Sequence, residues 1–272
     1  MTPHAQGAVS RAALLTVFAV LASACAQGGA TGRDAPGDAT LAFSEARIVS
    51  SDTENGATPM FLATPAGQRM LAWVSAPGGG EDGRLHVVVT DAMGASGPAA
   101  TIIDSIGPVE PHGESPPQLA AGADGRLYVQ YAVGKVVPGE RFPVSALRFV
   151  RSEDGGRTWS APVTVNDAGQ YGEFGSHNFH ALTVAPDGVL LSTWLDGREG
   201  ASGVWMSRST DGGRTWQANQ PIDTDPACPC CRTGVTAAAD GRLFVSWRTI
   251  LPGDIRDVVV ARSDDGGATW AE

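Results

Sequence analysis

The sequence predicts an all-β fold, a β-propeller whose blades each contain four antiparallel strands. An eight-residue motif rich in Gly and Asp recurs three times, at intervals of 57 and 54 residues. A second marker, a turn Gly followed six residues later by an aromatic residue at the end of an apolar stretch, recurs four times. The apolar residues alternate in short stretches without a helical period. Repeats of four strands and about 55 residues are typical of propeller blades.

Residues 1–25 are typical of a bacterial export signal. Arg11 supplies the positive charge before an apolar stretch of about ten residues, 12–21, which is too short to span a bilayer. The following sequence, Leu21-Ala22-Ser23-Ala24-Cys25, is similar to a bacterial lipobox, in which the cysteine is lipidated. Lipidation of Cys25 is therefore expected, and ordinary cleavage after Ala24 is the alternative.

Residues 26–45 are predicted to form a flexible tether, because they are rich in Gly, Ala and Asp and show no periodicity. No later stretch is long and apolar enough to cross a membrane. With a lipid on Cys25, the protein is expected to be exported and anchored to a bacterial membrane by its lipid alone, in the periplasm or at the cell surface.

Residues 46–272 contain the repeats that predict the propeller. The motif reads Ser-x-Asp-x-Gly-x-Thr-Trp and suits the turn between the third and fourth strands of a blade. Its glycines permit positive φ and its Asp and hydroxyl groups can bond the turn backbone, so we expect a structural role, with the Trp packed between sheets. The three boxes consist of Ser152, Asp154, Gly156, Thr158 and Trp159, of Ser209, Asp211, Gly213, Thr215 and Trp216, and of Ser263, Asp265, Gly267, Thr269 and Trp270.

The second marker divides the same region into four blades, of which the last is incomplete. The first blade has only a remnant of the box, at Thr90-Asp91. In the third blade, strands are expected at residues 180–184, 189–195, 203–207 and 217–222. The marker pairs are Gly67 with Trp73, Gly125 with Tyr131, Gly188 with Trp194, and Gly241 with Trp247.

The three boxes resemble the bacterial neuraminidase repeat, the Asp box of the sialidase-like propeller superfamily, over roughly residues 46–272. Sialidases have six blades, hold the sialic acid carboxylate with three arginines, and use a Tyr nucleophile helped by a Glu, with an Asp as acid/base. The resemblance implies a six-bladed propeller with four blades visible here, so the chain is expected to be a fragment that lacks about 110 residues. Alternatively, residues 47–50 pair with the last blade and close a four-bladed ring.

The sequence departs from the sialidase pattern in two places. The Phe-Arg-Ile-Pro signature expected in the first blade is absent, and the nearest string is Ala46-Arg47-Ile48-Val49. The chain has three tyrosines, of which Tyr128 and Tyr131 are expected to pack within a strand. The third, Tyr171, lies in a loop beside Glu173. No catalytic residue is therefore assigned.

Candidate substrate-binding residues lie on one rim of the predicted propeller. With this strand order, the Asp boxes lie on one rim, and the loops after the second and fourth strands lie on the other, where sialidases bind substrate. Asp196 and Arg198, Arg232, and Arg248 fall in or beside those loops. A guanidinium group can bind a carboxylate with two parallel hydrogen bonds. Salt bridges with neighbouring acids are the alternative role for each arginine.

A cysteine cluster on the same rim suggests a soft metal site. Cys228, Cys230 and Cys231 form a Cys-Pro-Cys-Cys sequence, and His177 and Cys230 each lie 11 residues before the Gly of their own repeat. His177 and His180 are therefore predicted to meet the cysteines around copper or zinc, which bind thiolate and imidazole ligands. A local disulfide in an oxidising compartment is the alternative.

The net negative charge limits the kinds of partner that the protein is expected to bind. Asp and Glu (29) outnumber Lys and Arg (19), and the net charge of −10 argues against a nucleic-acid partner. The resemblance implies an exported sialidase-like protein, either an exo-α-sialidase or a related glycoside hydrolase of surface glycans. The alternative is a non-catalytic propeller lipoprotein that binds a glycan, a protein partner or a soft metal through its Cys/His rim.

Overall fold

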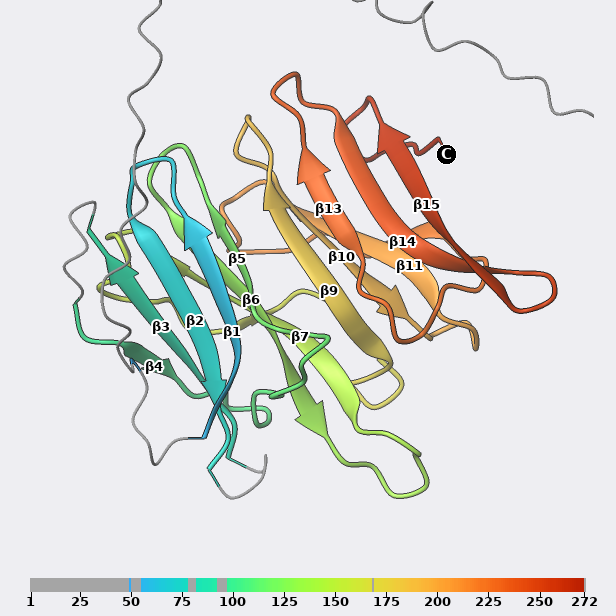
Figure 1. The fold of residues 1–272 in the computed structure, drawn as a ribbon, viewed down its shortest axis with the longest axis horizontal. Coiled ribbons are helices and arrows are strands. Elements are labelled where there is room, and N and C mark those ends of the chain that lie inside the picture. Colours follow the sequence, from blue (N-terminus) through green and yellow to red (C-terminus); the bar gives the residue numbers. More distant parts are fainter. Residues whose placement is uncertain (1–48, 50–54, 78–81, 92–96, 168, 272) are drawn as a thin grey trace, which may run out of the picture. The chain divides into compact units, whose positions relative to one another are not determined.

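The computed structural model describes residues 49, 55–77, 82–91, 97–167 and 169–271 (Figure 1). The predicted signal peptide, the lipidation site Cys25 and the tether 26–45 lie outside these residues. Within the described ranges the structure consists of fifteen β-strands and contains no helix, which confirms the all-β prediction. Accordingly, no helix among those residues could cross a membrane.

The strands form four antiparallel sheets that follow one another along the chain, and within each sheet the strands pair in chain order. The first two sheets contain β1 (Gly56–Ala63), β2 (Arg69–Ser75), β3 (Arg84–Thr90) and β4 (Ala100–Ile102), and β5 (Gln118–Ala121), β6 (Leu127–Lys135), β7 (Val144–Ser152) and β8 (Val163–Thr164). The other two contain β9 (His177–Val184), β10 (Leu190–Asp196), β11 (Gly203–Ser209) and β12 (Gln220–Asp223), and β13 (Gly234–Ala237), β14 (Leu243–Leu251) and β15 (Ile255–Ser263). These sheets are the four predicted blades, here called blades I to IV.

Among the described residues, blade IV has three strands. Ala271 forms an isolated antiparallel bridge with Arg262 of β15, where a fourth strand would pair. In blade III the observed strands lie within a few residues of the predicted ranges, and β9 begins three residues earlier, at His177.

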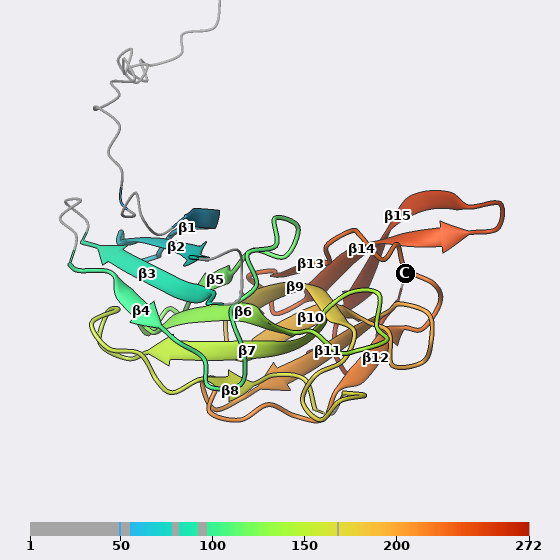
Figure 2. The same cartoon turned by 90° about the horizontal axis from the view of Figure 1, so that it is seen from below.

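The first strands of the blades lie on one side of the molecule. Strand β9 contacts both β5 and β13, and β1 contacts β5. Figure 2 shows β1, β5, β9 and β13 on the upper side, β8 and β12 along the lower edge, and β4 below β1 to β3 of its own sheet. Each sheet therefore runs from an inner first strand to an outer last strand, which is the order found in propeller blades.

The strand register defines two rims. In blade III, Leu190 pairs with both Val184 and Ser209, and the Asp box follows directly at this end. At the other end of the same strand, Asp196 pairs with His177 and Gly203. We call the end with the Asp boxes the box rim, and the opposite end, with the β6–β7, β10–β11 and β14–β15 loops, the loop rim.

The three Asp boxes have the same hydrogen bonds, as their shared sequence predicts. In the box of blade III, Ser209 Oγ accepts from the Gly213 N–H and donates to Asp211 Oδ1, with both distances 2.8 Å. The Thr215 N–H and hydroxyl donate to the two carboxylate oxygens of Asp211 at 3.0 and 2.6 Å. These bonds hold the pKa of Asp211 at about 2, against the partial burial that raises it. The boxes are therefore turn braces.

Each box also packs against the blade before it. A Cβ placed on Gly213 would lie 2.1 Å from Cε1 of Phe149, which belongs to β7 of blade II, so only glycine fits there. The Phe149 ring also meets the Trp216 ring edge-to-face at 5.2 Å. In the same way, Gly156 abuts Val89 of blade I. Together with the apolar side chains buried between sheets, the boxes join consecutive blades.

Candidate functional site

A groove of about 410 Å³ opens on the loop rim between blades II, III and IV. One wall is the β6–β7 loop, the floor is the start of β9, and the far wall is the cysteine loop that precedes β13. Its lining includes Glu140, Arg141, Phe142, Asn178, Phe179 and Cys230. The groove therefore lies where the strand order predicts a ligand-binding surface, and it combines apolar, charged and thiol groups.

The groove carries aromatic side chains and an arginine without an acidic partner. Phe142 is 69% exposed, and the Arg141 guanidinium lies 5.0 Å from its ring centroid. Within the described residues, Arg141 pairs with no carboxylate. One aromatic ring and one cation on this loop are therefore open to solvent.

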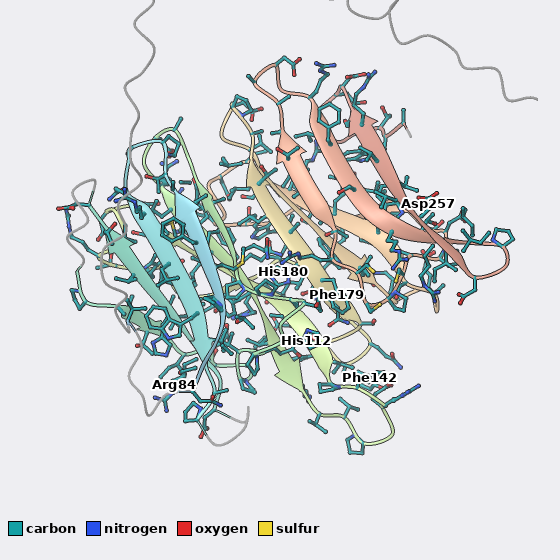
Figure 3. All side chains as sticks on the ribbon, viewed as in Figure 1. Arg84, His112, Phe142, Phe179, His180 and Asp257 are labelled. Carbon is teal, nitrogen blue, oxygen red and sulfur yellow. The ribbon has the colours of Figure 1, made fainter. Side chains whose placement is uncertain are left out.

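Phe179 holds a strained backbone conformation beside this groove. Its φ is +57°, which is rare for a residue other than glycine, and it coincides with a register shift between β9 and β10. Its ring meets His112 edge-to-face at 5.7 Å. Figure 3 shows His112, Phe179 and His180 close to one another near the centre of the view, with Phe142 on the loop beyond them. Backbone strain of this kind gathers at functional sites.

Tyr171 and Glu140 form a hydrogen-bonded pair at the groove. The Tyr171 hydroxyl donates to Glu140 Oε1 at 2.5 Å, and this bond raises the pKa of the phenol. The tyrosine lies in a tight turn that Gly172, with a φ of +79°, completes. The sequence placed Tyr171 beside Glu173, but Glu173 accepts a hydrogen bond from Thr164 instead. The Tyr–Glu pair is thus formed across two loops.

Asp196 and Arg198, two predicted substrate-binding residues, are engaged with each other and with a neighbouring blade. The buried Asp196 carboxylate accepts from Arg198 at 2.7 Å, from Trp194 Nε1 at 2.9 Å and from His177 Nδ1 at 3.0 Å. Burial raises the pKa of Asp196, but the bonds from His177 and Arg198 outweigh it and hold the pKa well below its usual range.

Arg198 makes further contacts on the outer side of the molecule. Its guanidinium also binds Asp167 at 2.9 Å and lies 4.2 Å from the Trp205 ring centroid. Asp167 precedes β9, and the arginine therefore connects blade III with the segment that enters it from blade II. The Arg198 guanidinium therefore makes its ion pairs and hydrogen bonds within the protein.

Arg232 and Arg248 differ from Arg198, because neither forms an ion pair with a carboxylate among the described residues. Both are exposed, and both lie on the loop rim near the cysteine loop. Arg232 is close enough to His180 to lower the pKa of that imidazole electrostatically, although burial is the larger cause. Arg248 Nη1 lies 3.8 Å from Cys231 Sγ.

The structure brings the three cysteines together but does not bring His177 or His180 to them. The potential ligand atoms of Cys228, Cys230 and Cys231 lie within 4.8 Å of one another, and no other His, Asp or Glu in the described ranges joins the group. His177 is buried against Asp196, and His180 is buried with Ser115 Oγ 3.2 Å from its Nδ1. His177 and Cys230 occupy equivalent positions in neighbouring blades. Such positions are separated by the distance between two blades, so their equivalence does not bring the side chains into contact.

The comparisons with known proteins agree with this geometry. No curated protein matches the chain. Residues 67–272 match the family described as "BNR repeat-like domain", which covers the whole region of the Asp boxes. The chain belongs to this family. The BNR repeats are the boxes that brace blades II, III and IV.

Solved structures share the fold of this BNR repeat-like domain at low identity. A protein of unknown function from Dyadobacter fermentans has a TM-score of 0.61 and 20% identity, over 81% of this chain and 69% of that chain. The intramolecular trans-sialidase from Ruminococcus gnavus has 0.56 and 15%, over 81% and 71%. The Hadza microbial sialidase Hz136 has 0.55 and 19%, over 80% of this chain and 46% of that chain. This chain thus spans less than half of the length of that sialidase.

Sequence reasoning missed the residues that shape the groove of this BNR repeat-like domain. The β6–β7 loop contains Glu140, Arg141 and Phe142 between two prolines. An arginine next to an aromatic residue in a loop of the predicted ligand rim was the available signal. Phe179 had no such signal, because its positive φ depends on the register shift beside β10.

Proposed function

We propose that this protein is an exported, lipid-anchored member of the sialidase-like propellers that binds an acidic glycan of the sialic acid class on its loop rim. The proposal rests on which arginines of the loop rim already have a carboxylate partner within the protein. Arg141, Arg232 and Arg248 have no carboxylate partner among the described residues, whereas Arg198 is fully paired. An arginine without an acidic partner is suited to bind the carboxylate of a ligand.

The apolar part of the groove suits the remainder of such a ligand. Phe142 and Phe179 offer aromatic surface next to the polar side chains of Asn178 and Glu140. Small-molecule sites combine apolar walls with a few polar groups that fix orientation. The fold supports this assignment, because the structural neighbours include a sialidase and a trans-sialidase.

Hydrolysis of the glycan is a second candidate function, favoured by the Tyr171–Glu140 pair. A tyrosine hydroxyl that donates to a carboxylate has a base in place to take its proton, which is the arrangement of an activated nucleophile. The pair lies beside the groove, since Glu140 lines it. In this candidate, Tyr171 attacks the anomeric carbon while Glu140 accepts the phenolic proton. The glycosidic C–O bond breaks and the departing oxygen takes a proton from solvent. Water then cleaves the bond between the sugar and Tyr171, and the phenol regains its proton.

Export and anchoring are proposed from the sequence of residues 1–25 alone. A lipid on Cys25 and a tether of residues 26–45 would present the propeller near a bacterial membrane surface. Mass spectrometry of the mature protein would test this, because a lipidated cysteine must be its first residue.

Binding is tested by calorimetric titration with 3′-sialyllactose, with neutral lactose as the matched ligand. Arg141→Ala, Arg232→Ala and Arg248→Ala are compared with Arg242→Ala, an exposed arginine on the box rim that pairs with Asp240. Losing one hydrogen bond to a charged group costs about 1.5–3 kcal/mol, or roughly a 10- to 150-fold weaker affinity. Equal affinity for lactose, or no effect of any loop-rim arginine, would refute the proposal.

Hydrolysis is tested separately with a fluorogenic sialoside. Tyr171→Phe and Glu140→Gln should each abolish product release. Tyr171 does not line the groove, so Tyr171→Phe should leave the binding of 3′-sialyllactose unchanged within a few fold. Binding without product release in the unmodified protein would reject hydrolysis and leave the binding function standing.

A further inference from the structure

The cysteine loop has a geometry that glycan binding does not require. Cys228 Sγ lies 3.5 Å from Cys230 Sγ and 3.1 Å from Cys231 Sγ, so three sulfur atoms surround one point. Three sulfurs arranged in a plane around one three-coordinate metal at about 2.3 Å would lie roughly 4.0 Å apart, so the observed sulfurs need to move apart by less than about 1 Å. We propose that Cys228, Cys230 and Cys231 bind a single copper(I) ion as three thiolate ligands.

The loop that carries these thiols is held at both ends by backbone hydrogen bonds. The Cys228 N–H donates to the Arg248 carbonyl at 2.7 Å, and the Ala227 N–H donates to Ser202 at 2.7 Å. Further along, the Thr233 N–H donates to the Phe179 carbonyl at 3.1 Å. Pro229 fixes one φ within the loop. Because β14, β9 and the β10–β11 loop all anchor it, the thiols are arranged before a metal arrives.

The number of ligands favours copper(I) over zinc. Zinc is nearly always four-coordinate, with four protein ligands in structural sites or three protein ligands and a water in catalytic sites. The described residues supply three sulfurs and no His, Asp or Glu ligand atom to the group, so zinc here would need a water as its fourth ligand, whereas copper(I) needs only the three sulfurs. Soft thiolate ligands suit copper(I), zinc and iron–sulfur clusters, so the number of ligands decides between copper(I) and zinc. A three-coordinate, all-sulfur site therefore fits copper(I) better.

The surrounding charges favour the same ion. When one Cu⁺ replaces the three thiol protons, the resulting unit carries a charge of −2. Arg248 Nη1 lies 3.8 Å from Cys231 Sγ, and Arg256 lies within electrostatic range of Cys228. Two guanidinium groups next to the sulfurs offset this charge, while a zinc trithiolate would carry only −1.

The site is also open to an incoming ion. Cys228 is 1% exposed, Cys231 is partly exposed, and Cys230 is exposed and lines the groove. An ion can therefore meet Cys230 first and then pass to the buried thiol. The proposal goes beyond glycan binding and does not depend on it, because none of the glycan tests involves a cysteine.

The test uses the whole chain carrying Cys25→Ser, which leaves the three loop cysteines as its only thiols. The protein is reduced, freed of reductant without oxygen, and titrated with copper(I) held by bathocuproine disulfonate. One copper(I) ion per chain should transfer to the protein, and the number of reactive thiols per chain should fall from three to zero. A parallel titration with zinc and a zinc indicator should show that the protein binds zinc more weakly than copper(I). X-ray absorption should show only sulfur neighbours around copper.

Variants make the result specific to the loop. Cys230→Ser changes an exposed side chain and should weaken copper(I) affinity by more than the roughly 10- to 100-fold loss typical of residues that only support a ligand. His112→Ala, which removes an exposed imidazole on the same rim, should leave it unchanged. Circular dichroism confirms that both variants fold. No copper transfer, preferred retention of zinc, or unchanged affinity in folded Cys230→Ser would overturn the proposal.

Discussion

Replacing Gly213 with alanine separates the backbone cost of an Asp box from its docking on the preceding blade. Gly213 has a φ of +80°, and a Cβ there would lie 2.1 and 2.6 Å from ring atoms of the buried Phe149. Gly188 is the matched control, because its φ is +86° but a Cβ there meets nothing within 4 Å. Both variants pay the left-handed backbone cost of about 1–2 kcal/mol.

Only Gly213→Ala also forces the Phe149 ring to move. Overpacking a well-packed core costs typically about 1–3 kcal/mol, so Gly213→Ala should be less stable than Gly188→Ala by that amount. For a domain of this size, the difference corresponds to roughly 2–4 °C in Tm per kcal/mol. Urea unfolding and differential scanning calorimetry of the full chain would measure it. Equal destabilisation by the two substitutions would refute the claim that the box glycine is selected by contact with the neighbouring blade.

Two further perturbations test buried polar groups. Asp196→Ala should cost about 3–5 kcal/mol in urea unfolding, because the buried His177 Nδ1 and Trp194 Nε1 lose their acceptor and Arg198 keeps only its outer partners. Arg242→Ala at the exposed box rim should cost less than about 1 kcal/mol. Burial lowers the pKa of His180 from 6.5 to about 4. As the pH falls, His180 is therefore protonated in the unfolded chain before it is protonated in the folded protein. About 3 kcal/mol of folding stability that is present above pH 6.5 should be lost as the pH falls to 4. In His180→Leu, the free energy of unfolding measured across this range should lose that component of its pH dependence, and an unchanged slope would contradict the assignment.

The blades could be predicted from sequence because their turns require particular residues. A box such as Ser209 to Trp216 needs positive φ at glycine, a hydroxyl and a carboxylate at fixed spacing, and these demands are local. The strand ends were less certain, and β9 begins at His177 rather than at the predicted His180.

The loop rim could be predicted only in part. Strand order indicated which loops gather there, and the three cysteines are indeed close to one another. Sequence could not show that Arg198 is already paired with Asp167, because that contact joins residues from segments 31 positions apart. Nor could it show that His177 faces Asp196, since the direction of a strand side chain depends on where the strand starts.

Because each box packs on the preceding blade, every one of these interblade contacts joins a box to a residue nearer the N-terminus. Gly156 rests on Val89, Gly213 on Phe149 and Gly267 on Met206, and in each case the partner lies earlier in the chain. A ribosome therefore releases the docking surface before it releases the box that uses it. Each blade can be locked onto its predecessor as soon as its own third strand and box have emerged, without waiting for any segment still to be synthesised. Growth of the nascent protein and closure of its interblade contacts can thus proceed in the same order.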